Sequence, residues 1–178
     1  MTPPPIFPAL ILALILAAIR PQAAKPSTEL AHVSNTFHFE IRAPLSRVAP
    51  LFGPEGERGW AGKHWNPEFL YPPSGKDIQG AVFQVQRGQH TSVWVNTLFD
   101  LAGGKMQYVA FIDQVVATTV DVKLTSTDAS RTTVEITYAR TALRPAANDD
   151  VRALGDGDRD DGPGWRKDIE KCLGLEPK

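Results

Sequence analysis

Residues 37–44 have the sequence FHFEIRAP, the part of the chain from which the fold is most directly predicted. Apolar side chains at Phe37, Phe39 and Ile41 alternate with polar ones, which is the two-residue period of a β-strand with one buried face. Pro44 then ends the strand, because proline has no backbone N–H to donate to a sheet. We therefore expect a strand here that lays one face against a core.

Short helical segments are predicted directly after this strand. Leu45, Val48 and Phe52 recur at helical spacing until residues 53–54, a Gly-Pro pair, stop the run. A second short helix or turn is expected over residues 55–62. It leads into a segment dense in aromatic side chains that continues to residue 71.

The middle of the chain is predicted to be almost entirely β-strand. β-branched and aromatic residues are concentrated in five segments bounded by Gly, Asp and Ser: residues 81–86, 91–99, 106–115, 118–125 and 132–143. The connections are short enough for antiparallel neighbours, and an edge strand around residues 69–71 would complete seven. Val134, Ile136 and Tyr138 share one face of the last strand, so one side of the sheet needs a cover.

The C-terminal segment is predicted to supply that cover as a helix beginning near Asn148. Its apolar and small residues fall near i, i+3, i+4 spacing: Val151, Leu154, Gly162, Trp165, Ile169, Cys172 and Leu173. Asn148 is expected to be the N-cap. Gly162-Pro163 disfavours a continuous helix, so a kink or interruption is expected there. Either a hollow lies under a kinked helix, or residues 155–163 form a loop between two short helices.

Residues 1–25 differ from the rest of the chain. The apolar run over residues 6–19 has the length of the hydrophobic region of a secretory signal and is shorter than the roughly 20 residues that span a bilayer. We expect a signal peptide or an uncleaved membrane anchor, with a buried N-terminal helix as the other possibility. The protein would then be periplasmic, secreted or anchored to the envelope membrane.

Composition excludes several classes of function. The chain has 178 residues with 42% hydrophobic content, which indicates one domain over residues 30–175. Its 19 basic and 20 acidic residues provide no positive field for nucleic acid. No His pair or Cys-x-x-Cys occurs, and residues 156–167 lack the Gly and Glu of a calcium loop, so no metal is expected. Motifs for nucleotide or nucleophilic catalysis are missing too, and no cofactor is predicted.

The order of these elements resembles the START-like, helix-grip superfamily (SRPBCC), which includes polyketide cyclases, lipid-transfer proteins and relatives of pollen allergens. Residues 37–44, with Val48 and Phe52, are similar to its first strand and helix, and residues 60–71 are similar to a segment of its uncharacterised bacterial members. The resemblance covers residues 36–173. It implies an α+β fold in which a curved antiparallel sheet of six or seven strands wraps around a long, kinked C-terminal helix. A pocket between them would hold an apolar or amphipathic ligand.

Large amphipathic side chains and strand parity suggest which residues line such a pocket. The aromatic candidates are Trp60, Trp65, Phe83, Trp94, Tyr108, Tyr138 and Trp165. Each of them could instead fill the core. Arg140 shares the inward face of Tyr138, so it would hold a carboxylate or phosphate of the ligand or form an internal ion pair.

His64 is the best catalytic candidate among the four histidines, because it is expected at the mouth of the pocket. With Tyr138 or Asn96 opposite, it could polarise a carbonyl in a cyclase-like or dehydratase-like reaction. No second titratable group is firmly predicted beside it, so we favour non-catalytic binding or transport of a small lipid-like or aromatic molecule. A protein with a collapsed core and no ligand is a third possibility. The sequence does not indicate an oligomeric state.

Overall fold

The computed structural model describes residues 29–175. The predicted signal peptide or anchor over residues 1–25 lies outside this part and stays a prediction. Within the described residues, the structure has no helix that is both long and apolar enough to cross a membrane.

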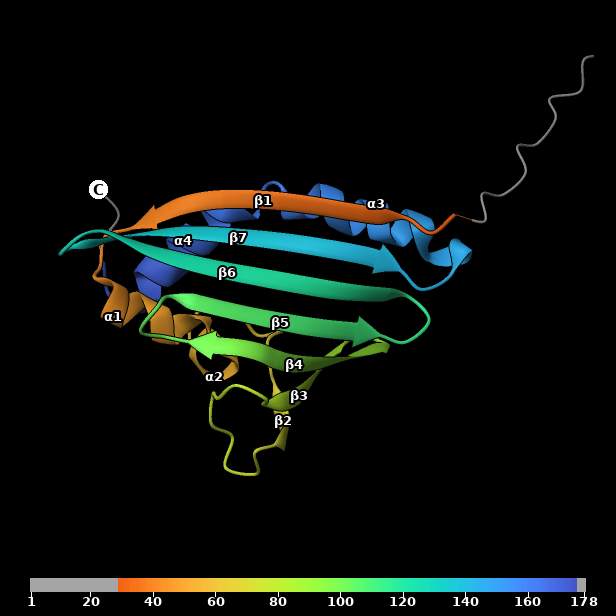
Figure 1. The fold of residues 1–178 in the computed structure, drawn as a ribbon, viewed down its shortest axis with the longest axis horizontal. Helices are drawn as coiled ribbons and strands as arrows, with labels where there is room; N and C mark the ends of the chain where they lie inside the picture. Colours follow the sequence, from red (N-terminus) through yellow and green to blue (C-terminus); the bar gives the residue numbers. More distant parts are fainter. Residues whose placement is uncertain (1–28, 176–178) are drawn as a thin grey trace, which may run out of the picture.

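The described chain forms a curved sheet with helices along one face (Figure 1). In chain order the elements are β1 (His32–Ile41), α1 (Leu45–Val48), the 3-10 helix η1 (Ala49–Phe52), α2 (Pro54–Glu57), β2 (Glu68–Tyr71), β3 (Val82–Arg87), β4 (His90–Asp100), β5 (Lys105–Ile112), β6 (Val116–Asp128), β7 (Arg131–Ala142), the 3-10 helix η2 (Pro145–Ala147), α3 (Asn148–Asp158) and α4 (Asp161–Cys172).

The sheet has seven strands in the order β1-β7-β6-β5-β4-β3-β2, and every neighbouring pair is antiparallel. This confirms the predicted α+β, helix-grip architecture with short helices after the first strand. Strand bounds differ in places. The segment predicted at 106–115 ends at Ile112, because Gln114 adopts a left-handed φ of 56° in the turn that follows.

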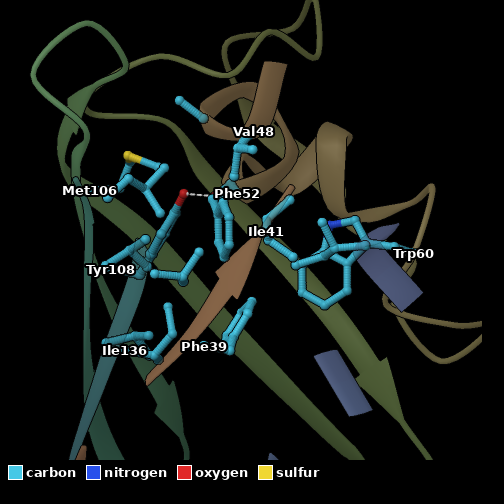
Figure 2. Packing of buried hydrophobic residues seen from close by; sticks show 14 of the residues in the cluster. Phe39, Ile41, Val48, Phe52, Trp60, Met106, Tyr108 and Ile136 are labelled. Atoms are coloured by element: carbon cyan, nitrogen blue, oxygen red, sulfur yellow. Dashed lines mark hydrogen bonds between the residues drawn. The ribbon is translucent and has the colours of Figure 1, made fainter. Parts of the chain in front are cut away.

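The largest buried cluster lies where α1 and η1 cover one end of the sheet. Phe52 packs among Ile41, Val48, Met106 and Ile136, all of them essentially inaccessible to solvent (Figure 2). Burying each such side chain contributes about 1.5–3 kcal/mol to folding. The alternating apolar positions of β1 therefore belong to this core, as its period predicts.

The helices α3 and α4 run behind β1 and β7 in Figure 1, and both contact β1. Small residues permit a close approach: a Cβ built on Gly155 would come within 2.7 Å of Cγ2 of Val33, and one on Gly162 within 3.3 Å of the Phe37 ring. These glycines were expected to leave a hollow beneath the helix. They instead bring the helices against β1.

The C-terminal prediction is confirmed in one detail, the interruption near Gly162-Pro163, and wrong in another. The helix is interrupted at residues 159–160, just before Gly162-Pro163, because Pro163 is accommodated in the first turn of α4, where a backbone N–H has no helical acceptor. Asn148 is not the N-cap but the first residue of α3. Its side chain accepts a bond from Ala31 N at 2.7 Å and donates one to Glu29 O at 2.9 Å, which ties α3 to the chain entering β1.

Cys172, expected on the apolar stripe of the C-terminal helix, is exposed. The second short helix, expected over residues 55–62, is confined to Pro54–Glu57.

The contact of α3 with β1 predicts opposite effects for two glycines of the same helix. Gly155→Ala should lower the free energy of unfolding by about 1–3 kcal/mol, because the new methyl group overlaps Val33. Gly157→Ala meets nothing within 4 Å and should raise it by up to about 1 kcal/mol through helix propensity. Urea denaturation measures both. A stabilising Gly155→Ala would contradict the close approach.

Candidate functional site

A cavity of about 860 Å³ lies between the concave face of the sheet and the α3–α4 pair. Strands β3, β4, β5 and β7 contribute to its wall, and α3 and α4 close the other side. Of the predicted pocket residues, it is lined by Trp60, Tyr138, Arg140 and Trp165. The structure therefore brings together residues from the loop after α2, from the last strand and from the last helix.

Its apolar wall is a contiguous group of rings. The Trp60 and Trp165 rings are 4.9 Å apart at an interplanar angle of 60°, and Trp165 meets Phe37 edge-on at 5.5 Å. The indole N–H of Trp60 donates to Leu51 O at 2.7 Å, which holds this ring in place. Edge-on and tilted ring pairs are favourable geometries, so the wall is well packed and presents aromatic surface to the cavity.

The other four predicted aromatic residues do not line this cavity. The indole N–H of Trp65 donates to Pro54 O, and the Tyr108 hydroxyl donates to Phe52 O, as the dashed line in Figure 2 shows. Phe83 is fully buried and stacks on the half-buried ring of Trp94. The four residues therefore lie in the core or pack against it. The Tyr108 bond joins η1 to the sheet, and the Trp65 bond joins the loop after α2 to the start of α2.

Arg140 forms the internal ion pair that was one of its two expected roles. Its Nε and Nη2 donate to the two carboxylate oxygens of Asp158 at 2.7 and 2.6 Å, and Nη1 donates to Thr118 Oγ1 at 3.2 Å. The guanidinium also lies 4.5 Å from the centre of the Tyr138 ring. Because the side chains of Arg140 and Asp158 are only 14% and 5% exposed, an anionic ligand would have to compete with a buried carboxylate.

Charged side chains also surround the more open part of the cavity. Arg87 and His90 lie at the β3–β4 turn and Arg144 follows β7, whereas Asp150 and Asp168 lie on the helices. Among residues 29–175, neither Arg87 nor Arg144 forms an ion pair with a carboxylate. In that same part of the chain, no three His, Cys, Asp or Glu side chains converge as a metal site would require.

Glu57 is a candidate functional residue that the sequence patterns did not single out. Its side chain is half-buried, and within the described part of the chain its carboxyl group has no hydrogen-bond or ion-pair partner. Burial raises the pKa of Glu57 well above its usual 4.5, Asp77 raises it further and Arg87 lowers it. Glu57 is the last residue of α2, and its backbone O accepts from Trp60 N at 3.0 Å, so a carboxyl group three residues before a tryptophan is the one signal in the sequence that could have drawn attention to it.

The charge of the Glu57 carboxyl group affects the pKa values of two tyrosines. Burial and, next in size, the charge of Glu57 raise the pKa values of both Tyr108 and Tyr138. Tyr138 lines the cavity and Tyr108 belongs to the adjoining core, as does Phe52, whose carbonyl Tyr108 contacts. The Glu57 carboxyl group therefore lies within electrostatic reach of both.

His64 lies outside the cavity lining. It is exposed in the loop between α2 and β2 and does not line the cavity, contrary to its expected place at the mouth. The neighbouring Trp65 is turned inward to reach Pro54, which leaves His64 directed toward solvent. No hydrogen bond joins His64 to Tyr138 or to Asn96, which is fully buried on β4.

The buried Arg140–Asp158 pair predicts that breaking a buried ion pair lowers the free energy of unfolding far more than breaking an exposed one. Asp158→Ala should lower the free energy of unfolding by about 3–5 kcal/mol, because it leaves the Arg140 charge buried without its partner. Asp149→Ala removes the exposed partner of Arg152 from the same helix and should cost about 1 kcal/mol or less. Chemical denaturation compares the two variants. Equal losses would contradict the stabilising role of the buried pair.

The raised pKa of Glu57 predicts that the difference in folding stability between wild type and Glu57→Gln depends on pH. Above about pH 4.5 the unfolded chain loses this proton while the folded chain retains it, so folding stability falls as pH rises toward the folded-state pKa. Glu57→Gln removes this dependence. The free energy of unfolding of Glu57→Gln relative to wild type should therefore increase with pH above 4.5.

Urea denaturation at a series of pH values measures that difference, in which the titration of other groups largely cancels. The groups that act on Glu57 or respond to it are Asp77, Arg87, Tyr108 and Tyr138, and all are retained in the variant. Glu55→Gln, on the exposed side of α2, is the matched control. Parallel stability curves for wild type and Glu57→Gln would contradict a raised pKa.

No protein-family model and no curated protein matches this chain in sequence. Solved structures match it over most of its length. An uncharacterised protein from Rhizobium leguminosarum has a TM-score of 0.58 at 15% identity, covering 83% of this chain and 98% of that one. Norcoclaurine synthase from Thalictrum flavum has a TM-score of 0.60 at 12% identity, covering 93% and 99%. CalU16 from Micromonospora echinospora has a TM-score of 0.56 at 13% identity, covering 84% of each chain.

Likeness at such low identity shows the fold and not the activity. The neighbours share the arrangement described above, in which an antiparallel sheet wraps around C-terminal helices. The resemblance predicted from residues 36–173 is confirmed at this level. The chain therefore has a helix-grip fold.

Proposed function

We propose that this protein binds a small amphipathic molecule, lipid-like or aromatic, without transforming it. The observation that carries the proposal is the cavity of about 860 Å³ walled by Trp60, Tyr138 and Trp165. Ligand pockets for small molecules have volumes of roughly 300–1,000 Å³ and combine aromatic surface with a few polar groups. Arg87, His90 and Arg144 are such polar groups in its lining.

A structural neighbour supports the size and chemistry of this ligand class. Norcoclaurine synthase from Thalictrum flavum has been solved in complex with dopamine and hydroxybenzaldehyde, and that structure has a TM-score of 0.58 to this chain at 12% identity. Both molecules combine an aromatic ring with polar groups. A cavity walled by tryptophans in the same fold suits ligands of this general kind.

Acid–base catalysis in the same cavity is the second candidate function. The observation that favours it is Glu57, because burial raises the pKa of this carboxyl group well above its usual value and so favours a role as proton donor. A cyclase-like or dehydratase-like step would then use Glu57 where His64 was expected. We favour binding because the buried Arg140–Asp158 pair is already neutralised and supplies no further acid or base.

Removing the aromatic wall should weaken ligand binding. Trp165→Ala is expected to lower the affinity for the fluorescent probe anilinonaphthalene sulfonate about tenfold, because it removes ring surface that a bound molecule would contact. Leu70→Ala removes an exposed apolar side chain from the β2 edge and should leave binding unchanged, as should His64→Ala. Fluorescence titration measures all three, with circular dichroism to confirm folding.

Native mass spectrometry of protein purified from its own host complements this test, because a retained molecule would reveal the natural ligand class. A folded Trp165→Ala variant with undiminished probe affinity would contradict the proposed cavity. Turnover of a co-purified molecule that Glu57→Gln abolishes would favour the enzyme.

A further inference from the structure

The more open part of the cavity is lined by three basic side chains, those of Arg87, His90 and Arg144. Two of them form a cross-strand pair at the β3–β4 turn, where Arg87 lies directly opposite His90. Arg87 shares the face of β3 that carries the buried residues Phe83 and Val85. Directly opposed residues of an antiparallel pair lie on the same face of the sheet, so Arg87 and His90 both belong to the concave face.

Arg144 lies at the same end of the sheet. It follows β7 in an extended conformation, with φ −156° and ψ 155°, so the alternation that turns Ala142 inward continues to it. Ala142 pairs with Val116, and Val116 pairs in turn with Ile112. Ile112 then pairs with the residue of β4 that is two positions after His90. The three basic side chains are therefore arranged around one end of the cavity.

The arginines at this end are not neutralised as Arg140 is. Arg140 also belongs to the concave face, but Asp158 is its ion-pair partner. Neither Arg87 nor Arg144 has such a carboxylate partner among residues 29–175. Asp150, in the first turn of α3, lines the same space, but within that part of the chain no ion pair joins it to either arginine. Two arginines against one carboxylate leave a positive charge at this end.

Glu57 is a carboxyl group on which the charge of Arg87 acts. Arg87 lowers the pKa of Glu57, but burial and the charge of Asp77 have larger and opposite effects, so the pKa is well above 4.5. A raised pKa disfavours the ionised carboxylate that would neutralise Arg87. The charge of Arg87 therefore remains available to an anion from outside the chain.

The turn that carries Arg87 and His90 is held in shape by side chains of the opposite face. Gln86 Nε2 donates to Gly88 O at 2.7 Å, and Gln86 Oε1 accepts from Thr91 Oγ1. Arg87 and His90 take no part in these bonds, so their donors stay free to meet a ligand while the backbone beneath them is fixed. Such preorganisation lowers the entropy cost of binding.

We propose that the Arg87–His90 pair binds an oxyanion of the ligand, such as a carboxylate, and that Arg144, three strands away, attracts the same group. This rests on the proposed binding function and narrows its ligand to an amphipathic acid. The guanidinium group of Arg87 can donate two parallel hydrogen bonds to a carboxylate, and the imidazole of His90 can donate a third. The sequence suggested Arg140 for this role, but Asp158 already occupies its donors.

The remainder of such a ligand would contact apolar side chains of the same cavity. Ile112 and Val115 line it from the sheet, between the strands that carry the basic residues, and Leu154 lines it from α3. The cavity continues to the rings of Trp60 and Trp165. Because the basic residues are exposed, the acid group keeps part of its hydration while the apolar part is buried, which limits the cost of binding a charge.

Binding of naphthoate and naphthamide, which differ in charge but hardly in shape, tests the proposal. Wild type should bind naphthoate about tenfold more tightly at low ionic strength, and salt should reduce this preference. Arg87→Gln should reduce it about fivefold by weakening naphthoate binding, and His90→Gln and Arg144→Gln by smaller factors. Arg131→Gln removes the same charge from the other end of the sheet and should leave the preference unchanged. Isothermal titration calorimetry measures each affinity.

The outcomes separate the oxyanion site from the binding function. If wild type binds both probes equally, the cavity binds ligands but the oxyanion site is refuted. If neither probe binds, the binding function fails and the oxyanion site fails with it. A preference that survives Arg87→Gln and His90→Gln, or that falls equally in Arg131→Gln, would contradict a local site at the β3–β4 turn. Tighter binding of naphthylmethylamine than of naphthoate would show that the carboxylates of the cavity lining, and not its arginines, select the ligand.

Discussion

The close contact of α3 and α4 with β1 is the constraint on which the cavity depends. Gly155 and Gly162 have no side chains, so the helices approach Val33 and Phe37 more closely than any larger residue would permit. The helices consequently pack on the β1–β7 side of a curved sheet. Over the remaining strands the sheet and the helices diverge, and the cavity occupies that space. The Arg140–Asp158 pair joins β7 to the end of α3 and holds the two layers at this spacing.

Electrostatics give the interior a consistent character. The charges of Arg140 and Asp158 neutralise each other, because two short hydrogen bonds join these side chains. Burial also raises the pKa of Glu57, which disfavours an isolated charge on this side chain. The cations of the cavity lining that have no carboxylate partner in the described chain, Arg87 and Arg144, are exposed. A neutral, aromatic interior beneath a charged opening is suited to amphipathic molecules rather than to ions.

Much of the fold was predictable from local patterns. Alternation at Phe37, Phe39 and Ile41 predicted β1, and short polar connections predicted the antiparallel order, because both depend on residues close in sequence. The prediction of an N-cap failed because a tertiary contact outweighed a local sequence preference. Asn148 is a favourable capping residue, but its side chain is used to hold the chain before β1. The interruption expected from Pro163 did follow from a local rule, because α4 begins at Asp161 and so accommodates the proline in its first turn.

The candidate site, too, was predictable from the sequence only in part. Amphipathic character and strand parity were enough to predict that Trp60, Tyr138, Arg140 and Trp165 face inward, and all four line the cavity. The same criteria selected Tyr108 and Phe83, which fill the core, because an inward direction does not reveal whether space is left in front of a side chain. That depends on distances between elements far apart in sequence. The partly buried position of Glu57 emerges only from the folded structure for this reason, since it depends on neighbours such as Asp77 and Arg87 that are distant in sequence.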